Sequence, residues 1–481
     1  MTEDPGLPLS FAPVSNGEYE PVPISPLLRR VNAEAREVCD AHAKAAGLSR
    51  REFLFSSAAL ATVLYVLDRS VAAASIRPPG GHYPIPPEAL VDPSAADAFF
   101  GEGDFVFDLQ GHLLEYDLNP ATKGRWFWGR QFPQADCGED DPRACFTMEH
   151  FLEEIFLRSD TSMVALSGLP LLPAGSALPL EVMEETRRVV ERLGGVERVI
   201  VNAQVLPTIA PFPAVAEEME RAVRESGVAG WKTFTHFPAD SGWRLDDHDP
   251  VLPRVGDDLL AQIEKLNRPV LCVHKGLSGG SRLASPVDIG PAAATHPGVR
   301  LVVYHSGYEV DHVEGPFVDR PPYLGVNRLI ASLRSAGIGP NQNVYAELGS
   351  TWWHLLRHPD QAAHVLGKLL LHVGENNVVW GTDSIFYGSP QPQIQALRAF
   401  QISDEFQQRF GYPALTGEIK RKILGLNAAR VFGVEPVYEP FTFSRLEIKE
   451  ARRTYPGSNR TYGPTTRAEV SSFRSHHQGW P

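Results

Sequence analysis

PVLCVHKG at residues 269–276 and RLVVYHSG at residues 300–307 decide the fold class of this chain. Each is a short run of apolar and β-branched residues that ends with a histidine and a glycine. Such runs are typical of strands that are buried on both faces of a parallel sheet. The segment between them is long enough for the helical crossover that two parallel strands need. The pair therefore predicts βα units.

Six further runs of the same kind extend this pattern along the chain. They lie at 105–112, 163–170, 199–207, 230–237, 343–350 and 377–384. Amphipathic helical stretches that end near Gly or Asn separate most of them. Eight parallel strands with right-handed crossovers predict a (β/α)8 TIM barrel, an α/β fold, and an open doubly wound sheet is the alternative. Neither a GxGxxG nor a GxxxxGK[ST] motif follows the first run, which argues against a nucleotide cofactor.

Three segments surround the predicted barrel of residues 76–438. Residues 1–75 form an N-terminal extension, and residues 439–481 form a polar tail that we expect on the surface. Residues 113–160 form a long insertion after the first strand, rich in Trp and Pro. Insertions of this length often build a lid over an active site. We therefore expect a lid here.

Composition and charge exclude several classes of protein. The 481 residues are 43% hydrophobic and 21% charged, as in a soluble globular protein. The formal charge is −13 with no basic stripe, which argues against nucleic-acid binding. The longest apolar stretch, residues 53–67, is too short to span a bilayer as a helix, so we expect no stable membrane span. The oligomeric state stays open, with a homo-oligomer among the choices.

SRREFL at residues 49–54 resembles the twin-arginine export signal. An apolar run follows it, and the alanines at 72–74 offer a small-residue cleavage site. We expect export to the periplasm or the outside of the cell, where Cys137 and Cys145 could form a local disulfide. The segment before the arginines is longer than usual for such a signal. The alternative is a cytoplasmic protein whose N-terminal helical arm packs on the main domain.

Polar side chains stand at the carboxyl ends of the predicted strands, where the active sites of barrel enzymes lie. They are Asp108, Gln110 and His112 on the first strand, Lys232 on the fourth, His274 on the fifth, His305 on the sixth, Glu347 on the seventh and Asp383 on the eighth. Alternation along the first strand places its three polar residues on one face. Imidazole and carboxylate groups that converge in this way indicate a divalent metal site.

Four of these strand ends carry a family resemblance. DLQGH at 108–112, CVHKG at 272–276, VVYHSG at 302–307 and VWGTDS at 379–384, followed by IKRKILGLNAARVFG at 419–433, resemble the amidohydrolase-2 branch of the amidohydrolase superfamily. Members of that branch are metal-dependent hydrolases and non-oxidative decarboxylases on a (β/α)8 barrel. The resemblance therefore implies an enzyme with one metal ion and a small-molecule substrate.

The resemblance also implies roles for single residues. His112 and His274 are implied to bind metal. Asp383 is implied to bind metal and to serve as acid or base, and His305 to be a second ligand or a catalytic histidine. Lys232 is implied to orient a substrate carboxylate or to support the site.

The sequence departs from that branch at Gln110, where the family usually has the first histidine of an HxH pair or a glutamate. A glutamine oxygen is a neutral and poorer zinc ligand than imidazole, so the preference shifts toward Mn2+ or Mg2+, or Gln110 does not coordinate. We expect one divalent ion, with Zn2+ first and Mn2+ or Mg2+ as alternatives. A degenerate, non-catalytic barrel is a further alternative.

The expected activity is hydrolysis of an amide or ester-like bond by a metal-activated water, with Asp383 and His305 as catalytic residues. The alternative is a carboxy-lyase that decarboxylates a small aromatic or unsaturated acid. That reaction needs a cation for the carboxylate, such as Lys232, and an aromatic wall, such as Trp126. Glu347 could face the pocket or pair with a neighbouring basic residue.

Overall fold

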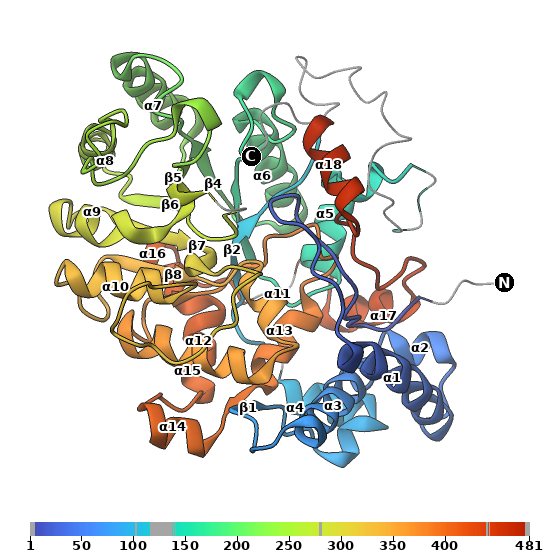
Figure 1. Cartoon of the computed structure of the whole chain (residues 1–481). Helices are drawn as coiled ribbons and strands as arrows, with labels where there is room; N and C mark the ends of the chain where they lie inside the picture. The colour runs from blue at the N-terminus through green and yellow to red at the C-terminus, as the bar shows by residue number, and fades with distance from the viewer. Residues whose placement is uncertain are drawn as a thin grey trace.

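The barrel sheet contains eight parallel strands in chain order. The computed structural model describes residues 5–101, 103–115, 137, 139, 141–278, 281–438, 441 and 443–476. The strands are β2 Phe107–Gly111, β3 Met163–Ser167, β4 Val199–Gln204, β5 Gly230–Phe234, β6 Val270–His274, β7 Arg300–Tyr304, β8 Val344–Glu347 and β9 Val378–Val379. Each lies within one of the eight predicted runs, so the predicted (β/α)8 barrel is confirmed (Figure 1).

The first and last strands are joined, which distinguishes this barrel from an open sheet. The backbone N–H of Leu109 donates to the carbonyl of Trp380 at 3.0 Å, and that of His112 donates to Ser384 at 2.7 Å. The Asp108 carboxylate adds a bond of 3.0 Å from the backbone N–H of Thr382. The alternative of an open doubly wound sheet is therefore wrong.

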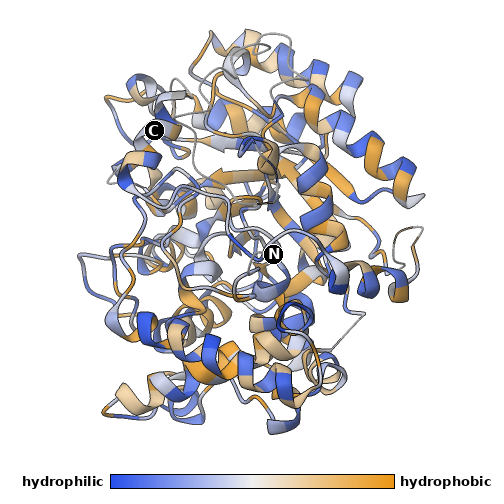
Figure 2. Ribbon diagram, turned by 90° about the vertical axis from the view of Figure 1, so that its right-hand side faces the viewer, coloured by the Kyte–Doolittle hydropathy of each residue, from blue (hydrophilic) through white to orange (hydrophobic). Residues whose placement is uncertain are grey.

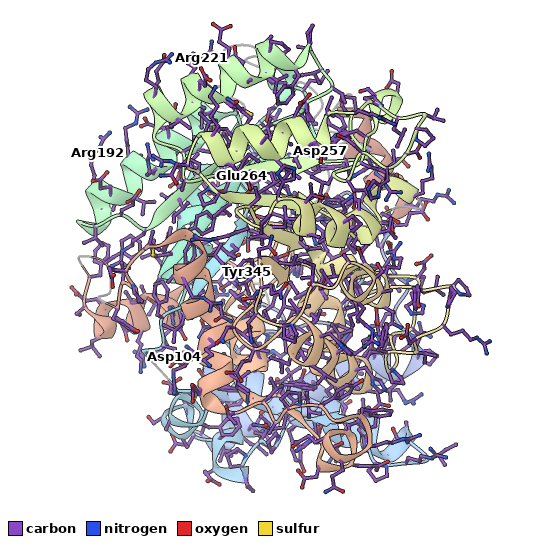
Figure 3. The ribbon with its side chains drawn as sticks, turned by 90° about the vertical axis from the view of Figure 1, so that its left-hand side faces the viewer. Asp104, Arg192, Arg221, Asp257, Glu264 and Tyr345 are labelled. Atoms are coloured by element: carbon purple, nitrogen blue, oxygen red, sulfur yellow. A yellow bond between two sulfur atoms is a disulfide. The ribbon has the colours of Figure 1, made fainter. Side chains whose placement is uncertain are left out.

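Helices surround the strands (Figure 1). They are α6 Leu180–Gly194, α7 Phe212–Ser226, α8 Gly256–Lys265, α9 Ile289–Thr295, α10 Asn327–Ser335, α11 Thr351–Leu355, α12 Pro359–His372, α13 Gln391–Ala399, α14 Asp404–Phe410, α15 Gly417–Arg421 and α16 Asn427–Phe432. Their apolar residues meet the strands, while charged residues such as Arg192, Arg221 and Asp257 point outward (Figures 2 and 3). This division is what amphipathic helices on a buried sheet require.

A second helical group lies beside the barrel (Figure 1). It contains α1 Pro26–Ala45, α2 Arg50–Leu54, α3 Ser57–Ala74 and α4 Pro93–Phe100. α3 is long and apolar enough to cross a membrane, but half of it is buried inside the structure. Arg51 donates to the carbonyls of Tyr455 and Gly457. This packing matches the alternative of a helical arm, and the twin-arginine signal stays a prediction.

A short ribbon ties the N-terminal helices to the barrel. β1 Gly81–His82 pairs antiparallel with β10 Gln401–Ile402. The tail returns over the same side through α17 Arg445–Thr454 and α18 Arg467–His476. Tyr462 and Phe473 of the tail are fully buried, so it packs more deeply than the expected surface segment.

The described segments 5–20 and 463–476, near the two termini, come together at the barrel mouth. Residues 5–20 run from the N-terminal helices to this mouth and lie beside α18 (Figure 1). The backbone N–H of Ser15 donates to the carbonyl of Pro464 at 2.8 Å. Two bonds from Arg474 to the carbonyls of Gly17 and Glu18, each of 2.7 Å, hold the same turn. The mouth is therefore covered by chain from both termini.

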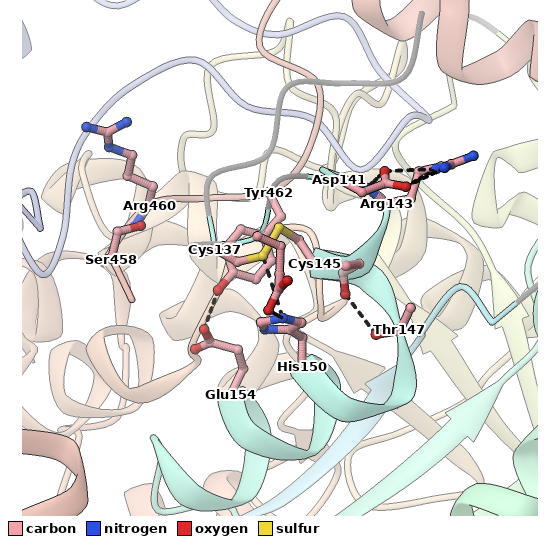
Figure 4. The surroundings of a disulfide bond; sticks show 12 residues. Cys137, Asp141, Arg143, Cys145, Thr147, His150, Glu154, Ser458, Arg460 and Tyr462 are labelled. Atoms are coloured by element: carbon pink, nitrogen blue, oxygen red, sulfur yellow. Dashed lines mark hydrogen bonds and ion pairs between the residues drawn. A yellow bond between two sulfur atoms is a disulfide. The ribbon is translucent and has the colours of Figure 1, made fainter. Parts of the chain in front are cut away.

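The insertion after β2 contains the expected disulfide, Cys137–Cys145 (Figure 4). After it come α5 Met148–Leu152 and a π-helical turn at Glu153–Leu157. Glu154 in this turn accepts a hydrogen bond from Tyr462 of the tail (Figure 4). Residues 116–136 lie outside the described residues, and the predicted lid and Trp126 lie largely or wholly among them.

Candidate metal centre

The strand ends bring the predicted polar side chains together at the barrel mouth. Gln110, His112, Lys232, His274, His305, Glu347 and Asp383 are each no more than 4% exposed. Four positions at the strand ends have positive φ without being glycine: His305 at 63°, Ser306 at 53°, Ser350 at 52° and Asp383 at 59°. Such backbone is costly and gathers at functional sites, where the surrounding structure enforces it.

Asp383 is the best-held carboxylate of the cluster. Its Oδ1 accepts a hydrogen bond of 3.0 Å from Gln110 Nε2 and lies 3.4 Å from His112 Nε2. Its Oδ2 accepts bonds from Ser350 Oγ at 2.5 Å and from Asn16 Nδ2 at 2.7 Å. Burial raises the pKa of Asp383, and the bonds from Ser350 and Asn16 oppose that rise. The result is a fixed carboxylate with a strengthened affinity for a proton or a cation.

His112 and His305 are oriented by backbone carbonyls. His112 Nδ1 lies 2.7 Å from the carbonyl of Ser167, and His305 Nδ1 lies 2.8 Å from that of Gly349. A carbonyl only accepts, so in both rings Nδ1 carries the proton and Nε2 keeps a free lone pair. Burial lowers the pKa of each ring to about 3. Both rings are therefore neutral at physiological pH, and each Nε2 can offer its lone pair to a metal ion. Because Nε2 of His305 carries no proton, it suits the role of a metal ligand better than that of a hydrogen-bond donor to an oxyanion.

His274 adds a third imidazole. Among the residues that the structure describes, neither ring nitrogen has a hydrogen-bond partner, although both are buried. Its Nδ1 lies 3.3 Å from Oε1 of Glu18, and its ring centre lies 4.7 Å from that of His305. Burial, with His305 next in importance, lowers its pKa well below the ordinary value. Burying two ring nitrogens without partners costs free energy, unless a bound ligand such as a metal ion contacts them.

These side chains fit a divalent metal ion. Neutral imidazoles with outward-held Nδ1 protons are typical zinc ligands, and carboxylates complete such shells. Donor atoms of Glu18, His274 and His305 all lie within 4.8 Å of one another. The same set suits Mn2+, because imidazole and carboxylate ligands serve both ions.

The family model for Amidohydrolase matches residues 182–434, which is more than half of the chain. The chain belongs to this amidohydrolase family. It is therefore an enzyme, its family is metal-dependent, and a small-molecule substrate is consistent with this. No curated protein sequence matches it.

Solved structures align with this amidohydrolase at low identity. A 2,6-dihydroxybenzoate decarboxylase from Rhizobium is 16% identical over 69% of this chain and 99% of that chain, with a TM-score of 0.38. A 4-oxalomesaconate hydratase from Rhodopseudomonas palustris is 14% identical over 68% and 95%, with a TM-score of 0.42. A dihydroxybenzoic acid decarboxylase from Polaromonas sp. JS666, solved with bound manganese, is 15% identical over 69% and 97%, with a TM-score of 0.38. Scores this low carry no argument about activity.

Lys232 of the amidohydrolase lies in a narrow pocket beside the cluster. The pocket is almost filled by side chains, with a cavity volume of about 10 Å³, and its lining includes Phe234 and Phe386. Lys232 Nζ lies 3.6 Å from the ring centre of Tyr304 and 4.7 Å from that of Phe234. Burial lowers its pKa to about 8, against the opposing effect of nearby acidic groups. It is placed to meet a small anionic group that enters the pocket.

Glu347 holds the backbone of two turns at the strand ends. Its carboxylate accepts hydrogen bonds from the backbone N–H groups of His305, at 3.0 Å, and Gly349. These bonds support the turns that carry the ligands. Burial raises its pKa well above the ordinary value. Contact between Glu347 and a substrate stays a prediction.

Gln110 faces the cluster, and the nitrogen and oxygen of its side-chain amide have different surroundings. Its Nε2 donates to Asp383, while its Oε1 is buried without a hydrogen-bond partner. The oxygen is therefore free to coordinate, although it carries no charge. Whether it does so stays a prediction.

Sequence reasoning missed Asn16 and Glu18, which reach the cluster from the N-terminal segment. Asn16 Nδ2 donates to both Glu18 Oε2 and Asp383 Oδ2 at 2.7 Å. Burial and the charge of Asp383 raise the pKa of Glu18 to about 8, with Lys232 acting against them. No strand or helix contains these residues, so no periodic pattern could have marked them.

Proposed function

We propose that this amidohydrolase is a metal-dependent hydrolase that cleaves an amide or ester-like bond of a small molecule. The observation that carries the proposal is Asp383. It is a buried carboxylate beside imidazole nitrogens, fixed by side-chain donors from Gln110, Ser350 and Asn16. A carboxylate with a raised pKa next to a metal is suited to act as a general base toward water.

The proposed ligands are His112, His274 and Asp383, with Gln110 as a further candidate through its free Oε1. When bound, a divalent ion polarises the scissile carbonyl and lowers the pKa of a water molecule. Asp383 accepts the proton of that water and passes it to the leaving group. We propose Zn2+ as the ion, with Mn2+ and Mg2+ as alternatives that metal analysis of the purified protein would separate.

Decarboxylation is the second candidate, and Lys232 favours it. Its buried ammonium lies beside the rings of Tyr304 and Phe234 and is suited to hold the carboxylate of an acid substrate. In this reaction Asp383 donates a proton to the carbon that loses carbon dioxide. The same strand-end residues serve both reactions.

Isotope labelling separates the two reactions. A panel of N-acyl amides, esters and aromatic carboxylic acids would be incubated with the enzyme in oxygen-18 water and, separately, in D2O. Hydrolysis places one labelled oxygen in the acid product, whereas decarboxylation releases carbon dioxide and places one deuterium on carbon. We expect labelled acid, and a drop of about 10³-fold or more in turnover for Asp383→Asn. Carbon dioxide release alone would establish the second candidate.

We also propose that the protein is exported with residues 1–75 retained, because Asn16 and Glu18 of this segment belong to the candidate centre. The Cys137–Cys145 disulfide supports this, because such bonds persist in oxidising compartments. The packed helices α2 and α3 support the cytoplasmic alternative instead. Cell fractionation combined with intact-mass measurement distinguishes export from retention, and Arg50→Lys with Arg51→Lys would trap an exported protein in the cytoplasm.

A further inference from the structure

The N-terminal segment places a carboxylate within the proposed metal centre. Glu18 Oε1 lies 3.3 Å from His274 Nδ1, and Glu18 Oε2 lies 3.7 Å from His305 Nε2. Neither nitrogen has a hydrogen-bond partner within the described part of the chain. Each Glu18 oxygen therefore lies close to a histidine nitrogen without forming a hydrogen bond to it.

These separations have the size expected between ligands of one ion. Two donors that each lie about 2.1 Å from a tetrahedral zinc ion are about 3.4 Å apart. The His112 Nε2 to Asp383 Oδ1 distance, 3.4 Å, has the same size. The distances from Glu18 to His274 and His305 are therefore long enough for a cation to lie between these side chains. Direct hydrogen bonds would be shorter and would leave no room for it.

The charge of the cluster also favours a cation near Glu18, because the single buried ammonium of Lys232 faces the two carboxylates of Glu18 and Asp383. The Glu18 carboxylate is about nine-tenths buried, and Asp383 is a second carboxylate joined to it through Asn16. The neighbouring strand residue Gln110 is neutral. Buried carboxylates are unfavourable unless a cation and hydrogen bonds compensate them.

The turn that carries Glu18 is held firmly from three sides. Asn16 Oδ1 accepts the backbone N–H of Glu18 at 2.9 Å, and Arg474 donates to the Glu18 carbonyl. Tyr19 OH lies 2.9 Å from Tyr387 OH. A loop fixed in this way can present a ligand with little loss of conformational entropy.

We propose that Glu18 is a ligand of the metal ion and supplies the carboxylate that Gln110 does not supply from the first strand. This inference rests on the proposed metal centre at His274. The centre then combines donors from the barrel with one donor from outside it.

The test is metal binding by the full chain. Zn2+ affinity would be measured by competition with a chromophoric chelator for the wild type, Glu18→Gln and His274→Ala. The matched control is Glu20→Gln, because Glu20 is an exposed carboxylate on the same segment that pairs with Arg467. Absorption of the Co2+-substituted protein reports the ligand set independently of activity, and circular dichroism checks the fold.

We expect Glu18→Gln to weaken Zn2+ binding by more than about 100-fold and to change the Co2+ spectrum, because loss of a ligand exceeds the 10- to 100-fold effect of an outer-shell change. Glu20→Gln should match the wild type. Wild-type affinity and an unchanged Co2+ spectrum in folded Glu18→Gln, together with loss of metal in His274→Ala, would overturn the role of Glu18 while keeping the centre. Absence of tight metal binding by the wild type would overturn both proposals.

Discussion

The barrel and the terminal segments both contribute to the candidate centre, but they hold their side chains in different ways. His112, His274 and His305 lie at the ends of strands whose backbone is fixed by the sheet. Asn16 and Glu18 lie on an irregular segment that is fixed by side chains, above all by Arg474 of the tail. The histidines of the centre therefore take their places with the barrel, whereas Asn16 and Glu18 take theirs only when the terminal segments dock.

The largest effect is expected on the barrel side. His274→Ala removes one of the proposed imidazole ligands, so we expect at least about 10³-fold weaker metal binding and no turnover. Elemental analysis of the purified variant measures this. His296→Ala is the control, because His296 lies on the outer surface near Asp257 and Glu264. Retention of one equivalent of metal by folded His274→Ala would place the centre elsewhere.

The next test asks whether the barrel can replace the terminal segment. Adding Gln110→Glu to Glu18→Gln moves the carboxylate from the segment to β2. We expect the double variant to recover about 10-fold or more of the lost Zn2+ affinity, because a charged oxygen replaces a neutral one. Chelator competition measures the recovery. Equal affinities of the double variant and Glu18→Gln would show that the two positions do not share one ion.

A smaller effect is expected from the clamp on the segment. Arg474→Ala removes two charge-assisted hydrogen bonds to the turn at Glu18, so metal affinity should fall by about 10-fold. Excess metal should restore the wild-type Co2+ spectrum, since the ligands themselves remain. Arg467→Ala is the control on the same helix, and an effect as large as that of Arg474→Ala would contradict the clamp.

The smallest effect concerns the anchoring of the tail at low pH. Burial alone would raise the pKa of Asp160, but Arg398 and Arg452 more than offset it, and the pKa lies well below its usual value near 3.8. Asp160 thus stabilises the fold above that usual value, and the stabilisation is lost as the pH falls below it. We expect Asp160→Asn to lose about 1 kcal/mol at pH 7.

Thermal unfolding from pH 3 to pH 7 would check this, with Asp319→Asn as an exposed control that pairs with Arg334. The difference between the wild type and Asp160→Asn should shrink toward pH 3. A difference that stays constant over this range would mean that protonation of Asp160 does not govern the tail.

The barrel could be predicted because each strand is recognisable from its own short stretch of sequence. Runs such as PVLCVHKG and RLVVYHSG each contain four or more consecutive apolar residues before the histidine, and the predicted ranges exceed the strands by only a few residues at their carboxyl ends. Once the strand ends are known, His274, His305 and Asp383 follow, because parallel strands bring their carboxyl ends to one rim.

The terminal half of the centre could not be predicted for a physical reason. Asn16 and Glu18 have no periodic neighbours, and their position depends on side-chain bonds to Arg474 and Asp383 far along the chain. The role of Glu347 was equally hidden, since its carboxylate serves backbone N–H groups that no side-chain pattern reveals. The tautomers of His112 and His305 depend on carbonyls of neighbouring strands in the same way.

The contact between Asn16 and Asp383 joins residues that are 367 positions apart. At the usual elongation speed of about 5–20 residues per second, a ribosome needs roughly 20–70 seconds to add the second partner after the first. The N-terminal segment can therefore dock only after the last strand has been synthesised, and Arg474 is synthesised later still. In this enzyme, cofactor loading would thus be a late event of biosynthesis, and it would discriminate complete chains from prematurely terminated ones.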